Sequence, residues 1–112
     1  MSEQIIVQDV PDRRRYEVRV DGTLAGTSHY LDTEVEGAAQ RIFFHTAIKD
    51  AFEGRGLAST LTREALRQTV DAGRRIVPVC PYVERWLTTH DEVAGAVDAV
   101  TPHHLALLER RG

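Results

Sequence analysis

Apolar and charged residues alternate in the first part of the chain, with the two-residue period of half-buried β-strands. The alternation is clearest where Tyr16, Val18 and Val20 are separated by charged side chains. Asp21 and Gly22 follow directly, and this pair is a strong signal for a hairpin turn. The pattern therefore predicts strands at residues 4–9, 14–20 and 23–31, followed by a polar loop at residues 32–40.

The middle of the chain changes from a strand pattern to a helix pattern and back. Residues 41–48 carry apolar side chains on both faces, which is typical of a central strand covered on both sides. One face is assigned to Ile42, Phe44, Thr46 and Ile48, and the other to Phe43, His45 and Ala47. Residues 57–72 have amphipathic helical spacing, and residues 74–80 predict a strand that Pro81 ends. Because strand–helix–strand units are right-handed and parallel, these two strands are expected to run in the same direction.

The last part of the chain is predicted to be helical. Residues 82–89 have the pattern of a short helix, and residues 90–100 are expected to be helical in part. Thr101 supplies a capping hydroxyl and Pro102 suits the first helical turn, so a final helix should run to about Arg110. The fold class predicted is α/β: a mixed sheet of five or six strands, with the 57–72 helix on one face and the C-terminal helices on the other.

Two glycines separate the central strand from the long helix. Gly54 and Gly56 let the backbone turn tightly and let a ligand approach without meeting a Cβ atom. The first amides of the following helix have no partner within it, and that end of the helix is positive, so the turn is suited to phosphate or pyrophosphate. Arg55 adds a side-chain cation. A lone Gly-x-Gly is more often explained by ordinary turn chemistry, but its position here, between an apolar strand and an amphipathic helix, favours a phosphate site.

Composition narrows the class of protein. The chain has 112 residues, 42% apolar and 28% charged, which predicts one globular domain over residues 1–112. A net charge of −3 gives no reason to expect nucleic acid, and no apolar run is long enough to cross a membrane. The single cysteine excludes an internal disulfide and fits a reducing cytoplasm, and no signal peptide is recognisable. Arg13, Arg14 and Arg15 could form a nucleic-acid patch, but the acidic chain favours a solvated strand edge.

The order of these elements and motifs resembles the core of the GNAT-type N-acetyltransferase superfamily. The pyrophosphate loop of that superfamily reads Gln/Arg-x-x-Gly-x-Gly/Ala, and here residues 53–58 match it except at Glu53. The chain resembles more narrowly the small single-domain YjdJ-like group, with a similarity that spans roughly residues 16–97. The segments that carry this resemblance are residues 45–48, 52–58, 78–82 and 90–93.

This resemblance implies binding of acetyl-coenzyme A and acetyl transfer to an amine. The backbone of Ala47 and Ile48 would pair with the pantetheine arm, and the thioester would lie near Cys80 and Tyr82. The pyrophosphate would be held by the segment made of Gly54, Arg55, Gly56, Leu57, Ala58 and Ser59. Two positions depart from the family pattern: Ala47 replaces a strand glutamate that would be a general base, and Glu53 replaces an arginine or glutamine.

Each candidate catalytic residue also has a purely structural interpretation. Cys80 could accept the acetyl group, or it could be a buried thiol at the end of an apolar strand. His45 could replace the missing carboxylate as base, because imidazole exchanges protons near neutral pH, or it could be a packed strand histidine. Tyr82 could protonate the departing thiolate or simply pack. The histidines near residues 90 and 103 do not predict a metal site, because no third ligand lies at suitable spacing.

Two function classes therefore remain open. The chain could be a small acetyltransferase, or it could be a module that binds coenzyme A or acyl-CoA with little or no catalysis. A short connection at residues 32–40 indicates an open acceptor site, which would suit a polyamine or an exposed protein amine. Neither nucleic acid nor a membrane is expected as a partner, and the protein is expected to be a monomer or homodimer.

Overall fold

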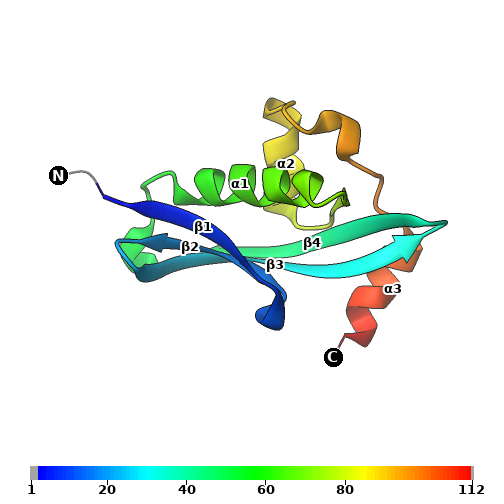
Figure 1. The fold of residues 1–112 in the computed structure, drawn as a ribbon, viewed down its shortest axis with the longest axis horizontal. Coiled ribbons are helices and arrows are strands. Elements are labelled where there is room, and N and C mark those ends of the chain that lie inside the picture. Colours follow the sequence, from blue (N-terminus) through cyan, green and yellow to red (C-terminus); the bar gives the residue numbers. More distant parts are fainter. Residues whose placement is uncertain (1–2, 112) are drawn as a thin grey trace.

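The computed structural model describes residues 3–111 and has the α/β fold that the sequence predicts. Its sheet has the strand order β1-β2-β3-β4-β5, so each strand lies beside its neighbour in the sequence (Figure 1). The first three pairings are antiparallel, and β4 and β5 are parallel. The strands are β1 (Ile5–Val10), β2 (Arg15–Val20), β3 (Thr23–Val35), β4 (Ala38–Ile48) and β5 (Arg75–Pro78).

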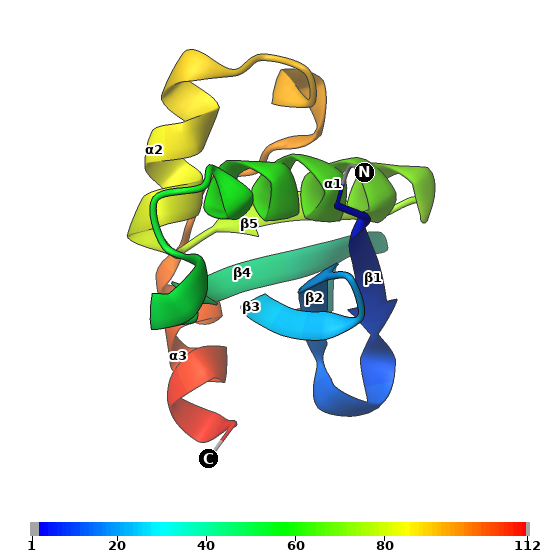
Figure 2. The same ribbon diagram turned by 90° about the vertical axis from the view of Figure 1, so that its left-hand side faces the viewer.

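Within residues 3–111, three α-helices cover the two faces of this sheet. They are α1 (Leu57–Asp71), α2 (Pro81–Thr89) and α3 (Pro102–Arg110). Figure 2 shows α1 and α2 on one side of the sheet and α3 on the other. We expected all the C-terminal helices on the second face, but Val83 and Trp86 of α2 pack into the same core as Leu61 of α1. β5 ends at Pro78, and α2 begins at Pro81, so the chain enters this helix directly after the strand and on the α1 side of the sheet.

Residues 32–40 do not form the predicted loop. β3 continues to Val35 and β4 begins at Ala38, so only Glu36 and Gly37 make the turn between them. Both have positive φ angles, 51° and 82°, as a tight two-residue hairpin requires. The polar residues that suggested a loop are cross-strand partners, because Asp32 lies opposite Arg41 in the register.

A β-bulge in β4 changes which side chains face α1. Tyr30 of β3 pairs with Phe43, whereas the preceding residue, His29, pairs with His45, so Phe44 is an extra residue in β4. The assignment of Phe43 and His45 to one face is therefore wrong. Phe43 and Ile48 both pack against the α1 core, whereas Phe44 lies on the opposite side, close to Arg111 at the end of α3.

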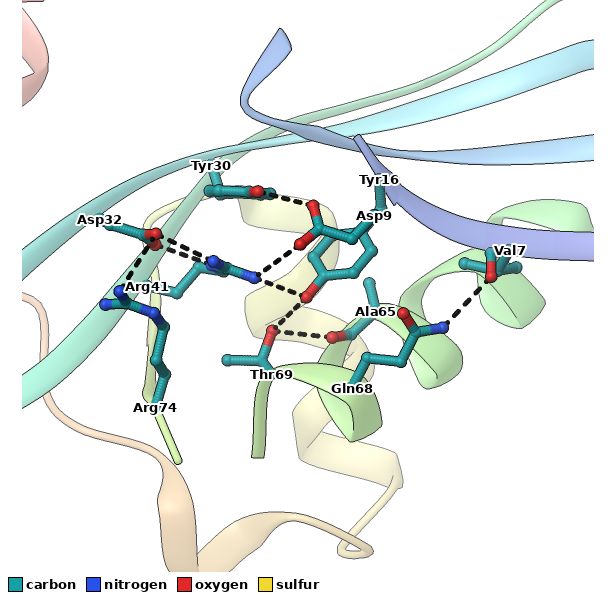
Figure 3. Close-up of polar contacts among 10 residues, drawn as sticks. All are labelled: Val7, Asp9, Tyr16, Tyr30, Asp32, Arg41, Ala65, Gln68, Thr69 and Arg74. Atoms are coloured by element: carbon teal, nitrogen blue, oxygen red, sulfur yellow. Dashed lines mark hydrogen bonds and ion pairs between the residues drawn. The ribbon is translucent and has the colours of Figure 1, made fainter. Parts of the chain in front are cut away.

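A buried polar network joins the sheet to α1 (Figure 3). Arg41 is only 7% exposed, and its guanidinium donates to both carboxylate oxygens of Asp32 at 2.7 and 2.9 Å. The same group donates to the Tyr16 hydroxyl at 2.7 Å, and Tyr16 Oη lies 3.0 Å from Thr69 Oγ1 of α1. Tyr30 donates to Asp9 at 2.6 Å. Because every charge is paired, this network connects four strands, β1 to β4, and the helix α1 without leaving a buried ion uncompensated.

The segment between α2 and α3 contains one short 3-10 turn, Ala94–Ala96, and a bridge between Ile76 and Val97. Residues 90–100 are therefore helical only in this small part, as expected. Two other 3-10 turns, Pro11–Arg13 and Asp50–Phe52, follow β1 and β4.

Candidate active site

A cleft of about 380 Å³ lies between the carboxyl end of β4 and the N-terminus of α1. It is called the glycine cleft below. Seven of its lining residues were singled out by the sequence, and Phe52 and Glu53 complete the wall. The residues from the sequence-based set are Ile48, Gly54, Gly56, Leu57, Ala58, Ser59 and Tyr82.

The backbone at this cleft is open to a ligand. Gly54 and Gly56 have φ angles of 77° and 75°, in the left-handed region that favours glycine. A Cβ atom built at either position would meet nothing within 4 Å. Gly56 is the N-cap of α1, and no side chain caps that end of the helix. The first amides of α1 are therefore available to an anion, so these residues fit a pyrophosphate group.

The edge of β4 is free beside the same cleft. β4 pairs with β5 only from Gln40 to Phe43, and the Cys80 N–H then donates to the Phe43 carbonyl at 2.8 Å. Beyond this point the two parallel strands separate. The Lys49 N–H donates to the Ala25 carbonyl of β3 at 2.8 Å, and alternation along an antiparallel strand then directs the Ile48 backbone away from β3. The backbone of Ala47 points toward β3 by the same alternation, opposite Thr27.

The charged side chains of the turn, Glu53 and Arg55, do not form a clamp for phosphate. Arg55 does not line the glycine cleft; it forms an ion pair with Glu3, and its guanidinium carbon lies 5.6 Å from the centre of the Phe52 ring. Glu53, in contrast, lines the cleft. The backbone amides are therefore the main donors that this geometry offers to an anion.

Cys80 lies at the N-cap of α2, just after β5 ends. Its side chain is 3% exposed, and its sulfur lies 3.5 Å from the Thr46 hydroxyl. Tyr82 follows in the first turn of α2 and reaches the glycine cleft. The thiol thus lies inside the core. It is close to the glycine cleft along the chain, because Tyr82 and Ile48, which line the cleft, are each two residues from Cys80 and Thr46 respectively.

His45 lies apart from these residues. Its side chain is exposed, and the bulge directs it to the α3 side of the sheet, where its ring centre is 5.7 Å from that of His29. Burial, with the nearby charges of His45, Arg15 and Arg111, lowers the pKa of His29. The structure does not bring His45 into the glycine cleft.

Two features beside the cleft have no clear sequence signal. Trp86 of α2 donates through Nε1 to Ser59 Oγ at 2.9 Å and so supports the first turn of α1. Its ring stacks on His90, with ring centres 4.0 Å apart. The contact between Thr46 and Cys80 is the second feature. Only the pairing of β4 with β5 brings Thr46 and Cys80 together, so neither spacing nor composition could reveal the contact.

Among residues 3–111, no three His, Cys, Asp or Glu side chains come together as a possible metal site. No helix in this part of the chain is both long enough and apolar enough to cross a membrane.

The family of the protein follows from its sequence, and it agrees with the geometry of the glycine cleft. Residues 15–96 match the family model of the GCN5-related N-acetyltransferases, which is well over half of the chain. The protein therefore belongs to this family. The match does not reach the narrower YjdJ-like group, which stays a prediction. No curated protein sequence matches the chain.

Solved structures support the fold. One similar structure is a ribosomal-protein-alanine N-acetyltransferase from Brucella melitensis biovar Abortus 2308, with a TM-score of 0.56 and 19% identity over 78% of this chain. Another is an integron cassette protein from the mobile metagenome of V. cholerae, with a TM-score of 0.54 and 9% identity over 86% of this chain. The chain spans only 62% and 65% of the lengths of these two proteins.

Proposed function

We propose that this protein binds acetyl-coenzyme A and transfers its acetyl group to an amine. The observation that carries the proposal is the glycine cleft, where the uncapped N-terminus of α1 lies beside the free edge of β4. An anion cradle and an unpaired strand edge together suit a ligand that joins a pyrophosphate to a peptide-like arm. Membership of the GCN5-related family supports the same ligand.

The proposed roles follow from position. Amides from Gly54 to Ser59 would hold the pyrophosphate, and the Ile48 backbone would pair with the pantetheine arm. The Ala47 backbone, which is directed toward β3, would not take part in that pairing. Tyr82 lines the cleft and would protonate the departing thiolate. Acetyl-coenzyme A would supply an activated acetyl group as a thioester.

Cys80 has two possible roles in this proposal. As a nucleophile, its sulfur would bond to the acetyl carbon while the carbon–sulfur bond to coenzyme A breaks. Tyr82 would give its proton to the coenzyme A thiolate and take up the proton lost by Cys80. The amine would then displace Cys80, which would regain a proton from the amine. In the second role the acceptor attacks the thioester directly, and Cys80, with Thr46, only forms part of the pocket wall.

A module that binds coenzyme A or acyl-CoA without turnover is the second candidate. Two observations favour it: Cys80 is 3% exposed, and His45 lies on the face away from the glycine cleft. Ala47 also provides no carboxylate for proton removal. Both candidates require the same ligand cleft, so binding and turnover need separate tests. A cytoplasmic location and a monomeric or homodimeric state are expected in either case.

Binding is tested by thermal unfolding with coenzyme A. A ligand at 100 times its dissociation constant adds about 2.7 kcal/mol to the free energy of unfolding. For a domain of this size the expected rise in Tm is on the order of 10 °C. Gly56→Asp should abolish the rise, because it adds bulk and negative charge to the cradle. Gly73→Asp is the matched control, because Gly73 has the same open surroundings and a similar φ of 79°, but it follows the opposite end of α1.

Both variants should lose stability to a similar degree, since both force a side chain into the left-handed region. Gly73→Asp should keep the full ligand-induced rise. Equal rises in the two variants, or no rise in the folded wild-type protein, would contradict the proposed site.

Turnover is tested by following free coenzyme A released from acetyl-coenzyme A with a panel of amines. If Cys80 is the nucleophile, Cys80→Ser should remove nearly all turnover, and the wild-type protein without acceptor should gain the mass of one acetyl group. If Cys80 only lines the pocket, Cys80→Ala should keep most of its rate. Binding with no release for any amine would support the non-catalytic module.

A further inference from the structure

The structure gives the arginines of the first turn a neighbour that the sequence does not suggest. Arg13 and Arg14 lie in the turn between β1 and β2, and Arg111 lies at the end of α3. Figures 1 and 2 place this turn and the end of α3 on the same side of the sheet. Together with His29 and Phe44 they line a pocket of about 190 Å³, called the basic pocket below.

The basic pocket carries positive charge without a matching carboxylate. Within residues 3–111, none of the three arginines forms an ion pair, and no acidic side chain lines the pocket. The next arginine along the chain, Arg15, differs, because it pairs with Glu17 at 2.7 Å. The lowered pKa of His29, caused first by burial and then by the charges of His45, Arg15 and Arg111, is consistent with this positive field.

The walls of the basic pocket are held in place. Arg14 has a φ of 53°, which is uncommon for a residue with a side chain. Its N–H donates to the Pro11 carbonyl, and its own carbonyl accepts from the Tyr30 N–H, both at 3.0 Å. The guanidinium of Arg111 lies over the Phe44 ring, 4.2 Å from its centre. An oxyanion would therefore meet cations whose supports are already in position, which reduces the ordering cost of binding.

The basic pocket also lies next to the segment of β4 where the parallel strands separate. Phe44, the bulged residue, lines the pocket, and His45 follows with its ring 5.7 Å from His29. The next residue, Thr46, contacts the Cys80 sulfur from the other side of the sheet. The pocket and the proposed transfer site thus lie on opposite faces of the same segment of β4.

We propose that the basic pocket binds a carboxylate or phosphate group of the acetyl acceptor. The charge and shape of the pocket by themselves support binding of an oxyanion. That this oxyanion belongs to the acetyl acceptor rests on the proposed function. The acceptor is then a small amine that also carries an acidic group. A polyamine is disfavoured, because its own charges would be repelled by the three guanidinium groups.

The anion site is tested by NMR of the histidine rings during titration with inorganic phosphate and, separately, with succinate, at constant ionic strength. The His29 signals should shift saturably, and the His29 pKa should rise, because a bound anion favours the charged imidazole. Arg111→Gln should weaken binding about tenfold, the loss of one charge-assisted hydrogen bond. Arg110→Gln is the matched control: it removes the same charge from the adjacent residue, which does not line the basic pocket. No saturable shift, or equal weakening in both variants, would overturn the site.

The link to the acceptor is tested by comparing acetylation of β-alanine, ethylamine and spermidine. β-Alanine should have the highest kcat/KM, and Arg111→Gln should remove that preference mainly through KM, while Arg110→Gln keeps it. Transfer without any preference for the carboxylate would overturn the assignment to the acceptor. If phosphate binds saturably but no amine is acetylated, the proposed function fails while the anion site stands.

Discussion

At the scale of single residues, Gly26 of β3 is a position that leaves no room for a side chain. A Cβ atom built there would lie 2.4 Å from Ile48 Cδ1 and 2.8 Å from the Ala47 carbonyl oxygen. The Ile48 side chain can rotate away, but the carbonyl belongs to the backbone of β4. The absence of a side chain at Gly26 therefore sets the position of the strand edge that borders the glycine cleft.

Gly26→Ala is expected to lower the free energy of unfolding by about 1–3 kcal/mol, the usual cost of overpacking a core. Gly95→Ala is the control, because a Cβ at Gly95 meets nothing within 4 Å. Urea denaturation of the two variants measures the difference. A Gly26→Ala protein as stable as Gly95→Ala would show that the strands can separate freely at this point.

Arg41 shows what a residue pattern cannot reveal. The sequence places it at the start of an apolar strand, yet it is nearly buried and lies over the Tyr30 ring, 3.8 Å from the ring centre. Its partners come from distant parts of the chain, including Asp9 and Asp32. Desolvation by burial opposes its charge, but the hydrogen bonds that Arg41 donates to Asp32, together with the neighbouring charges, outweigh this effect and raise the pKa of Arg41. A two-residue alternation identifies the strand but not the tertiary partners that allow a charge inside it.

At the scale of elements, periodicity predicts what is regular and misses what interrupts it. The helical spacing of apolar residues in α1, and the apolar strand before it, placed the two glycines in a turn between a strand and a helix. This was enough to predict most residues of the glycine cleft. The β3–β4 hairpin was not predicted, because its polar residues suggested a loop. In the structure Asp32 and Arg41 lie opposite each other on the two strands and stabilise the pairing, which a local count of polar residues cannot detect. The extra residue at Phe44 has no compositional signal, so the faces of β4 after it were assigned wrongly. That bulge directs Phe44 toward the basic pocket and His45 away from the glycine cleft.

At the scale of the whole molecule, α3 is held to the sheet by a buried histidine. His104 is 2% exposed, and its Nδ1 accepts from the Thr101 N–H at 3.0 Å. Because Nδ1 is the acceptor, the proton is on Nε2, which donates to Gln40 Oε1 of β4 at 2.8 Å. Gln40 in turn donates to Asp98 at 2.8 Å. A neutral ring therefore both caps α3 and attaches it to the central strand, and a second ring proton would break the cap.

This arrangement predicts that stability decreases as the solution is acidified through neutral pH. Burial, and then the charge of His103, lower the pKa of His104, while Asp98 acts in the opposite direction. The ordinary pKa of histidine is about 6.5, so below that pH the unfolded chain takes up a proton that the folded chain refuses. Above that pH both states are neutral, so the free energy of unfolding keeps its full value and no longer changes with pH through this group. The pKa of His29 is lowered as well and acts in the same direction.

The free energy of unfolding, measured with urea between pH 7.5 and 5.5, should fall by up to about 1.4 kcal/mol per pH unit for each proton involved. His104→Gln should reduce this slope, because glutamine at the third helical position can still reach the Thr101 N–H but does not titrate. His103→Gln, one residue away and exposed, should keep most of the slope. If stability is constant over this range, or if both variants have the wild-type slope, then the attachment of α3 does not depend on a neutral His104.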